Sequence, residues 1–214
     1  MHRHQLVTEI EESGVVAVVR MADAEKCAQV VEAYREGGVT AIEITMTTPG
    51  ALEVIDRVST AMGDSAHIGV GSVLDDTTAR MAIEAGARYV VSPVFDTEMI
   101  ETAHRYDVPV MPGCFTPTEI KKAHEAGADM VKVFPAKVVG MKFFSAVKAP
   151  MPHLKLMPTG GVSPENAGDW IRAGASCVAA GSALFDKEAV AAGDFDQLTE
   201  NARALRRTVE EARA

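Results

Sequence analysis

The sequence predicts one α/β domain that spans residues 1–214 and folds as a (β/α)8 barrel (a TIM barrel) with an extra helix before its first strand. Three observations support this prediction. Short apolar runs alternate with segments of helical spacing, and the runs are continuous, as in strands buried on both faces. Eight such runs in 214 residues leave about 27 residues for each strand–helix unit, close to the minimum for such a repeat. A doubly wound open sheet is the alternative fold.

The predicted strands are apolar runs rich in β-branched residues, at 15–19, 41–44, 67–70, 89–91, 108–111, 130–134, 154–157 and 177–180. Segments with apolar residues three and four apart separate them and predict covering helices, at 24–36, 50–62, 77–85, 97–106, 117–126 and 164–173. One further helix is predicted before the first strand, over residues 3–13, and another at the end of the chain, over residues 196–213.

A recurrent glycine indicates where a helix ends and the chain turns back into a strand. It stands at Gly38, Gly86, Gly127 and Gly174. Glycine adopts the left-handed conformation that terminates helices, so these positions are predicted to be structural. Because these turns precede the strands, we expect the functional residues at the opposite, carboxyl ends, where barrels of this kind place their sites.

Composition limits the classes of partner. The chain holds 21 Lys and Arg against 30 Asp and Glu, for a net charge of −9. Such a surface repels nucleic-acid phosphates and anionic lipid, so neither nucleic acid nor membrane is an expected partner. Three cysteines without CxxC spacing and a beginning without the apolar region of a signal peptide predict a cytoplasmic protein. The six histidines show no HxH or HExxH spacing, so no metal site is expected.

Two charged residues lie inside predicted strands. Lys132 is flanked by valines and Glu43 by isoleucines. Burial disfavours the ammonium form of a lysine, and the neutral amine is the form that attacks a ketone to make a Schiff base. A buried carboxyl group is suited to accept and donate protons in turn. The alternatives are a lysine that reaches solvent from a strand edge, and a structural ion pair of Glu43 with Lys132 or Arg20.

Glycine-rich segments follow the last two predicted strands. Thr159-Gly160-Gly161 comes after the seventh, and Gly181-Ser182 after the eighth. Two adjacent glycines let the backbone approach an anion, and loops at these two positions often form a phosphate site in such barrels. Ser163 is a candidate N-cap of the next helix, with Pro164 at its first position. A plain turn is the alternative.

Six motifs occur in one order along the chain: Glu43-Ile44-Thr45-Met46-Thr47-Thr48-Pro49, Gly71-Ser72-Val73-Leu74, Ser92-Pro93, Met111-Pro112-Gly113, Val131-Lys132-Val133-Phe134-Pro135-Ala136 and Pro158-Thr159-Gly160-Gly161-Val162. Together they resemble the class I 2-keto-3-deoxy-6-phosphogluconate (KDPG) aldolase family, whose members often also cleave 2-keto-4-hydroxyglutarate (KHG). The resemblance extends from about Gly14 to Leu184. It implies a homotrimeric (β/α)8 barrel that forms an imine with its keto acid and needs no metal or other cofactor.

The resemblance also implies an activity and roles for particular residues. The activity is cleavage of KDPG to pyruvate and glyceraldehyde 3-phosphate, and of KHG to pyruvate and glyoxylate. Lys132 matches the lysine that forms the imine, and Glu43 matches the general acid and base. Substrate-binding positions match Arg20, Thr45, Thr47, Ser72, Pro93, Phe134 and Thr159. Phosphate-binding positions match Gly160, Gly161, Gly181 and Ser182.

Two departures from the family pattern concern the substrate. Some members have arginine where this chain has Thr47, and Ser72 replaces the commoner threonine. Both leave open the choice among KDPG, its galactonate epimer and KHG. Two other classes of function are alternatives. A metal-dependent phosphosugar epimerase or isomerase needs several metal ligands at strand ends, and a non-catalytic sensor of phosphorylated ligands leaves Lys132 unexplained.

Overall fold

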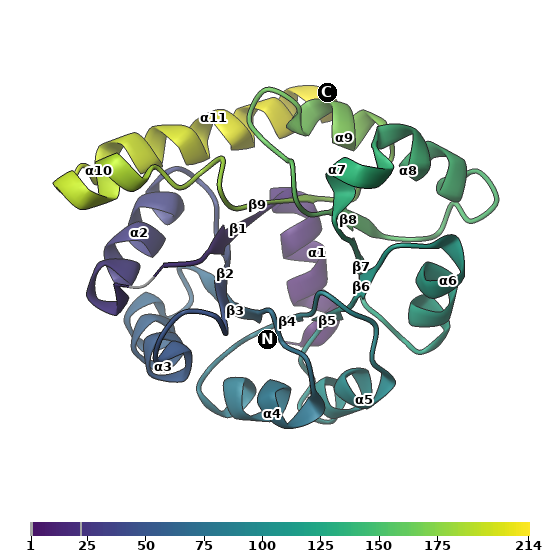
Figure 1. Ribbon diagram of the computed structural model, residues 1–214, viewed down its shortest axis with the longest axis horizontal. Helices are drawn as coiled ribbons and strands as arrows, with labels where there is room; N and C mark the ends of the chain where they lie inside the picture. The colour runs from purple at the N-terminus through teal and green to yellow at the C-terminus, as the bar shows by residue number, and fades with distance from the viewer. Residues whose placement is uncertain (1, 22) are drawn as a thin grey trace.

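The computed structural model describes residues 2–21 and 23–214, and its strands encircle a common axis with the long helices outside them (Figure 1). The strands are β1 (Val15–Val19), β2 (Ala41–Thr45), β3 (His67–Gly71), β4 (Val90–Val91), β5 (Val110–Met111), β6 (Gly113–Cys114), β7 (Val131–Val133), β8 (Leu156–Pro158) and β9 (Val178–Ala180). All the strand pairs described are parallel. The fold is therefore α/β with parallel sheets.

The helices of the described chain are α1 (Arg3–Ser13), α2 (Ala24–Glu36), α3 (Ala51–Met62), α4 (Asp76–Glu84), α5 (Thr97–Arg105), α6 (Pro117–Glu125), α7 (Ala136–Val139), α8 (Met141–Lys148), α9 (Ala167–Arg172), α10 (Lys187–Ala192) and α11 (Phe195–Arg213). Asp or Thr side chains cap the first N–H groups of α2, α4, α5, α6 and α10. No helix in the described residues has the length and apolar character needed to cross a membrane.

The strands form two sheets, in the orders β5-β4-β3-β2-β1-β9 and β6-β7-β8. Backbone contacts link the sheets at both edges. Thr159 forms a parallel bridge with Ala179, which joins the end of β8 to β9. On the other side, the Lys132 N–H donates to the Pro112 carbonyl over 3.0 Å. Pro112 separates β5 from β6; the predicted run at 108–111 contains β5 and ends before β6.

Neighbouring residues of β1, β2, β4, β5, β8 and β9 belong to two separate apolar cores. Val15, Ala17 and Val19 pack with the outer core beneath the helices. Val16 of the same strand packs instead with the inner cluster, which lies within the ring of strands. The inner cluster consists of Leu6, Ile10, Val16, Ala41, Tyr89, Val91, Met111, Met130, Met157, Cys177 and Ala179. This double burial explains why the strands are continuously apolar in sequence.

Helix α1 lies across the middle of the ring in Figure 1 and packs against its amino-terminal end. Leu6 and Ile10 of this helix belong to the inner cluster. Three polar pairs tie α1 to residues at or just before the starts of strands: Glu9 to His67 at 2.8 Å, Glu11 to Lys155 at 2.5 Å and Arg3 to Asp129 at 3.3 Å. The predicted helix over residues 3–13 is thus present, and it closes one end of the ring.

The predicted glycine turns are confirmed. Gly38, Gly86, Gly127 and Gly174 all have positive φ, between 86° and 108°. After Gly86, the Ala87 N–H donates to the Ala82 carbonyl over 2.9 Å, which is the six-to-one bond of a Schellman motif. These turns set the orientation of the strands, and the carboxyl ends lie opposite α1.

Other predicted boundaries were wrong. The helix predicted from Pro164 begins at Ala167, and Ser163 is not its N-cap. The Asn166 side chain instead folds back, accepting from the Ser163 N–H and donating to the Gly161 carbonyl, both at 2.9 Å. This turn satisfies backbone groups that a longer helix would have used. The short elements β6, α7, α8 and α10 were not among the predicted elements.

Candidate active site

Lys132 and Glu43 both lie on the inner face of the ring. Lys132 follows Met130 by two residues, and Glu43 follows Ala41 by two, and both of these apolar residues belong to the inner cluster. Side chains two apart in a strand share a face. Lys132 is 5% exposed and Glu43 is 1% exposed. The sequence-based expectation that both are buried is confirmed, and Lys132 does not extend into solvent from a strand edge.

The Lys132 ammonium has no polar partner among the described residues, where it forms neither a hydrogen bond nor an ion pair. Its Nζ atom lies 5.1 Å from the centre of the ring of Phe134, which follows Lys132 by two residues in the sequence. An aromatic face attracts a cation more weakly than a carboxylate does, and it does not hold the nitrogen lone pair when the amine is neutral. The amine is therefore available to react.

The buried Oε2 atom of Glu43 has no hydrogen-bond partner among the described residues. Burial raises the pKa of this carboxyl group, and the charges of Lys132 and Arg20 partly oppose that rise. No ion pair joins Glu43 to Lys132 or Arg20 in the described part of the chain, so the structural ion pair considered from sequence is not formed. A buried carboxyl group with a raised pKa can act as an acid and as a base near neutral pH.

Gly71 of the neighbouring strand makes room for this carboxyl group. A Cβ atom on Gly71 would lie 1.7 Å from the Glu43 Oε1 atom. Glycine is thus required at this position by close approach, and not by its φ angle. In the sequence, Gly71 belongs to a motif that directly follows the strand predicted at 67–70, whereas β3 extends through Gly71. The contact with Glu43 therefore gives no signal in the sequence.

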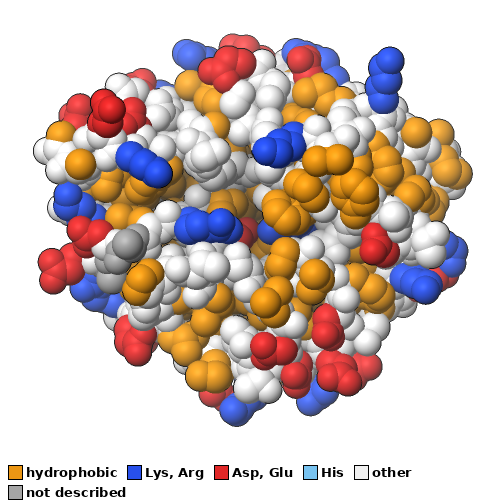
Figure 2. Space-filling view, in the orientation of Figure 1, with side chains coloured by type: hydrophobic (Ala, Val, Ile, Leu, Met, Phe, Trp, Pro, Cys, Tyr) orange, Lys and Arg blue, Asp and Glu red, His pale blue; other side chains and the backbone are white. Residues whose placement is uncertain are grey.

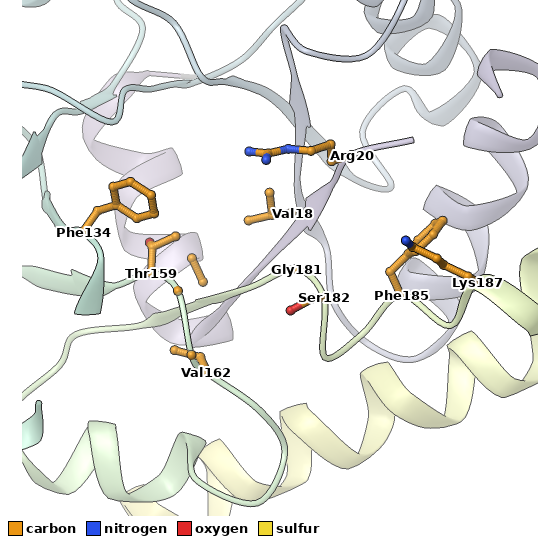
Figure 3. Close-up of a pocket in the computed structure, with 12 residues that line it drawn as sticks. Val18, Arg20, Phe134, Thr159, Val162, Gly181, Ser182, Phe185 and Lys187 are labelled. Carbon is orange, nitrogen blue, oxygen red and sulfur yellow. The ribbon is translucent and has the colours of Figure 1, made fainter. Parts of the chain in front are cut away.

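A cavity of about 480 Å³ opens beside Phe134. Seven predicted site residues line it: Arg20, Phe134, Thr159, Gly160, Gly161, Gly181 and Ser182. Figure 3 shows these residues converging from β1, β7 and the loops after β8 and β9. Five further lining residues were not predicted: Val18, Val162, Ala179, Phe185 and Lys187. Strand alternation could have found Val18 and Ala179, which precede Arg20 and Gly181 by two residues.

The cavity suits an anion, although the chain as a whole is acidic. Its lining includes the cations Arg20 and Lys187 and no Asp or Glu. Gly160 and Gly161 have φ values of 88° and 90°, and in the described structure the Gly161 N–H group donates to no protein acceptor. The buried Thr159 hydroxyl also lacks a partner. Figure 2 shows Lys and Arg side chains around the central hollow of this face.

Six predicted site residues do not line this cavity. Two of them, Lys132 and Glu43, lie inside strands β7 and β2, and the other four, Thr45, Thr47, Ser72 and Pro93, lie at neighbouring strand ends. Thr45 ends β2, and its Oγ1 atom lies 2.9 Å from that of Thr47. Ser72 follows β3 with a left-handed φ of 59°, and Pro93 lies in a bend after β4. These residues share the carboxyl-end rim with Lys132 and Glu43. Among the described residues, no group of three or more His, Cys, Asp or Glu could hold a metal ion.

The chain is similar in sequence and in fold to known aldolases. The family model described as "KDPG and KHG aldolase" matches residues 6–201. The 2-dehydro-3-deoxy-phosphogluconate aldolase of Pseudomonas aeruginosa is 36% identical to the chain over 204 residues, covering 93% of this chain and 90% of that protein. This chain belongs to the KDPG and KHG aldolase family. The resemblance identified from the six sequence motifs is therefore confirmed, and the chain is an aldolase.

Other members of the family show the range that it spans. The 2-dehydro-3-deoxy-6-phosphogalactonate aldolase of Escherichia coli is 34% identical over 172 residues, covering 80% of this chain and 84% of that protein. The crystal structure of KDPG aldolase from Legionella pneumophila aligns with a TM-score of 0.87 and 25% identity, over 96% of this chain and 98% of that one. That protein was captured with pyruvate as a covalent carbinolamine intermediate.

Proposed function

We propose that this aldolase cleaves KDPG to pyruvate and glyceraldehyde 3-phosphate through a Schiff base on Lys132, with Glu43 as the acid and base. The observation that carries the proposal is the state of Lys132. Lys132 is 5% exposed, its amine has no polar partner in the described chain, and its Nζ lies 5.1 Å from the centre of an aromatic ring that borders a cation-lined cavity. A buried amine that no polar group engages is free to attack a ketone.

The first half of the proposed reaction forms the imine. The Lys132 Nζ atom attacks the C2 carbonyl carbon of the substrate, giving a carbinolamine. Glu43, in its carboxylic acid form, donates a proton to the C2 hydroxyl group, which leaves as water. The raised pKa of Glu43 keeps a proton available for this step at a pH where an exposed carboxyl group would have lost it.

The second half breaks the carbon–carbon bond. The Glu43 carboxylate takes the proton of the C4 hydroxyl, and the electron pair of the C3–C4 bond moves into the protonated imine. Glyceraldehyde 3-phosphate leaves, and an enamine remains on Lys132. Glu43 returns its proton to C3, and hydrolysis of the imine then releases pyruvate and restores the amine. One carboxyl group serves throughout because each step leaves it in the form that the next step needs.

The remaining site residues are proposed to orient the substrate. Arg20 reduces the pKa rise of Glu43 through its charge, so it lies near the reacting end and suits the substrate carboxylate. The free N–H group of Gly161, with Gly160, Gly181 and Ser182 beside it, suits the phosphate. Thr159 presents an unpartnered hydroxyl to the cavity between these ends. Thr45, Thr47, Ser72 and Pro93 complete the rim around the keto acid.

We also propose that residues 1–214 form a single closed eight-stranded (β/α)8 barrel. The pairing of β1 with β9, the bridge from Thr159 to Ala179 and the bond from Lys132 to Pro112 support a closed ring. Labels β5 and β6 then denote two parts of one strand. The free, buried cysteines fit a reducing, cytoplasmic compartment.

A homotrimer is the proposed assembly. Four large apolar side chains near the carboxyl ends of the strands are exposed to solvent in the single chain. The exposed fractions are 61% for Leu74, 45% for Val94, 41% for Phe115 and 64% for Val138. Hydrophobic side chains also gather beside the central hollow in Figure 2. Apolar patches of this kind mark protein interfaces. Light scattering on the purified protein is expected to give three times the chain mass, and a monomer mass would contradict this assembly.

Imine formation can be tested directly by trapping. Incubation with pyruvate and sodium borohydride is expected to reduce the imine, attach a permanent adduct to Lys132 and abolish activity. Peptide mass mapping identifies the site, and Lys137, an exposed lysine on the adjacent helix α7, provides the comparison within the same protein. An unmodified Lys132 in a protein that keeps its activity would contradict the mechanism. Cleavage rates for KDPG, its galactonate epimer and KHG, read by a lactate-dehydrogenase-coupled pyruvate assay, then establish the preferred substrate.

A further inference from the structure

Lys187 is the second cation of the cavity, and no role was assigned to it from sequence. It lines the cavity together with Gly160, Gly161 and Ser182, the proposed phosphate-binding residues. Figure 3 shows it across the cavity from Phe134, with its amino nitrogen turned toward the interior. We propose that Lys187 determines specificity for phosphorylated substrates by binding the substrate phosphate with its ammonium group. This inference rests on the aldolase function proposed above.

The position of Lys187 is fixed by the cap of α10. Lys187 is the first residue of this helix, and the Asp186 carboxylate accepts hydrogen bonds from the Glu188 and Ala189 N–H groups at 2.9 and 3.0 Å. Asp186 is thereby engaged with the backbone and does not pair with Lys187. In the described chain, the Lys187 ammonium forms no hydrogen bond or ion pair. A free cation at the mouth of a cavity is available to a ligand.

The charges of the cavity are divided between its two ends. Figure 3 shows the Arg20 side chain extending toward the side of the cavity that holds Phe134, whose ring lies beside the Lys132 Nζ atom. Lys187 lies on the other side and comes from the segment after β9, next to the loop that carries the free Gly161 N–H group. KDPG carries a carboxylate at the reacting end and a phosphate at the other. Two cations without a lining carboxylate therefore match the two anionic groups of this substrate.

The geometry also explains why Lys187 would discriminate between substrates. The Gly161 N–H group can bind any anion that reaches it, but a phosphate near neutral pH carries almost two charges. A lysine ammonium is a mobile point charge suited to that oxygen cluster. A substrate without the phosphate gains nothing from it. The contribution of Lys187 should thus appear only with phosphorylated substrates.

The test compares KDPG with 2-keto-3-deoxygluconate, which lacks the phosphate. In Lys187→Met, kcat/KM for KDPG is expected to fall about 10- to 100-fold, the usual effect of losing a hydrogen bond to a charged group. The loss should lie mainly in KM, and kcat/KM for the unphosphorylated acid should change less than about threefold. Lys187→Arg keeps the charge and should retain most of the KDPG activity.

Controls separate this inference from the proposed function. Lys142→Met makes the same change in net charge at an exposed lysine of α8 that does not line the cavity, and it should leave both substrates unaffected. Pyruvate trapping on Lys132 should be normal in Lys187→Met, because pyruvate has no phosphate. Equal losses on both substrates, or an unchanged KM for KDPG, would overturn the role of Lys187 while leaving the imine chemistry in place. Failure of trapping in the unaltered protein would overturn the proposed function instead.

Discussion

Two sets of side chains share the inner face of the strands but differ in chemistry. The inner cluster holds Met130 and Met157, while two residues further along the same strands stand Lys132 and Thr159. On β2, Ala41 is followed in the same way by Glu43. On the inner face of a strand, a shift of two residues toward the carboxyl end thus leads from the apolar inner cluster to the polar residues of the candidate site.

The two sets are interdependent. The inner cluster excludes water from beneath Lys132 and Glu43, and it is this loss of water that raises the Glu43 pKa. Burying an unpaired amine and an unpaired carboxyl group costs stability, which the apolar filling must offset. The inner cluster is therefore expected to govern stability, and the polar residues above it are expected to govern activity.

Exchanging one residue from each set gives the largest contrast. Lys132→Met should lower kcat by about 10⁴-fold or more, because the nucleophile is lost. Its unfolding free energy should stay the same or rise, because an apolar chain of similar length replaces a buried amine. The coupled pyruvate assay and urea unfolding measure the two effects.

Met130→Ala is the matched variant from the inner cluster. It should lose about 2–5 kcal/mol of unfolding free energy through the cavity it leaves, while kcat of the folded fraction changes only a few-fold. If Met130→Ala abolished activity without loss of stability, or Lys132→Met kept its activity, the division between the two sets would be wrong.

Gly71 tests how closely the carboxyl group must be positioned. In Gly71→Ala the new Cβ atom would meet Glu43 Oε1, so the carboxyl group must move. We expect about a 10²-fold fall in kcat, the size associated with a displacement of about 1 Å, and a stability loss of about 1–3 kcal/mol from overpacking. Adding Glu43→Asp shortens the side chain and should recover the lost stability but not the activity. A double variant no more stable than Gly71→Ala would show that the clash lies elsewhere.

The smallest expected effect is the pH dependence of stability. Folding raises the pKa of Glu43 above its ordinary value near 4.5, so the folded protein retains a proton that the unfolded chain releases. As pH rises from about 4.5 to the raised value, the Glu43 contribution to the unfolding free energy falls by about 1.4 kcal/mol per pH unit.

Glu43→Gln cannot ionise and should lack this fall. Its unfolding free energy relative to the unaltered protein should therefore increase with pH within that window and stay constant below it. Urea unfolding at a series of pH values measures the difference. A difference independent of pH would mean that Glu43 ionises in the folded state as readily as in the unfolded one.

Strand positions could be predicted because burial on both faces leaves a strong sequence signal. The run at residues 15–19 coincides with β1. The helix α8 was missed because Phe143, Phe144 and Val147 give a dense apolar stretch, and of these only Phe144 and Val147 are buried. The cap predicted at Ser163 failed because Asn166, three residues later, competes for the same backbone groups.

The site was predictable where it lies on strands and unpredictable where it lies beyond them. Lys132 and Glu43 are conspicuous as single charges in apolar runs. Lys187 stands in an ordinary polar segment, and nothing in its neighbours shows that the chain after β9 brings it back over the cavity. The close contact of Gly71 with Glu43 likewise arises only because β2 pairs with β3, and the sequence of neither strand alone shows that pairing.

The helix that closes the ring at its amino-terminal end has a consequence for the order of events during turnover. Leu6 and Ile10 seal that end with hydrocarbon, so traffic with the solvent is confined to the opposite mouth. In the reaction proposed above, the pyruvyl fragment stays covalently bound to Lys132 after cleavage, while the aldehyde is held by no covalent bond. Under that proposal the aldehyde departs first through this mouth, and the same path then admits the water that frees pyruvate.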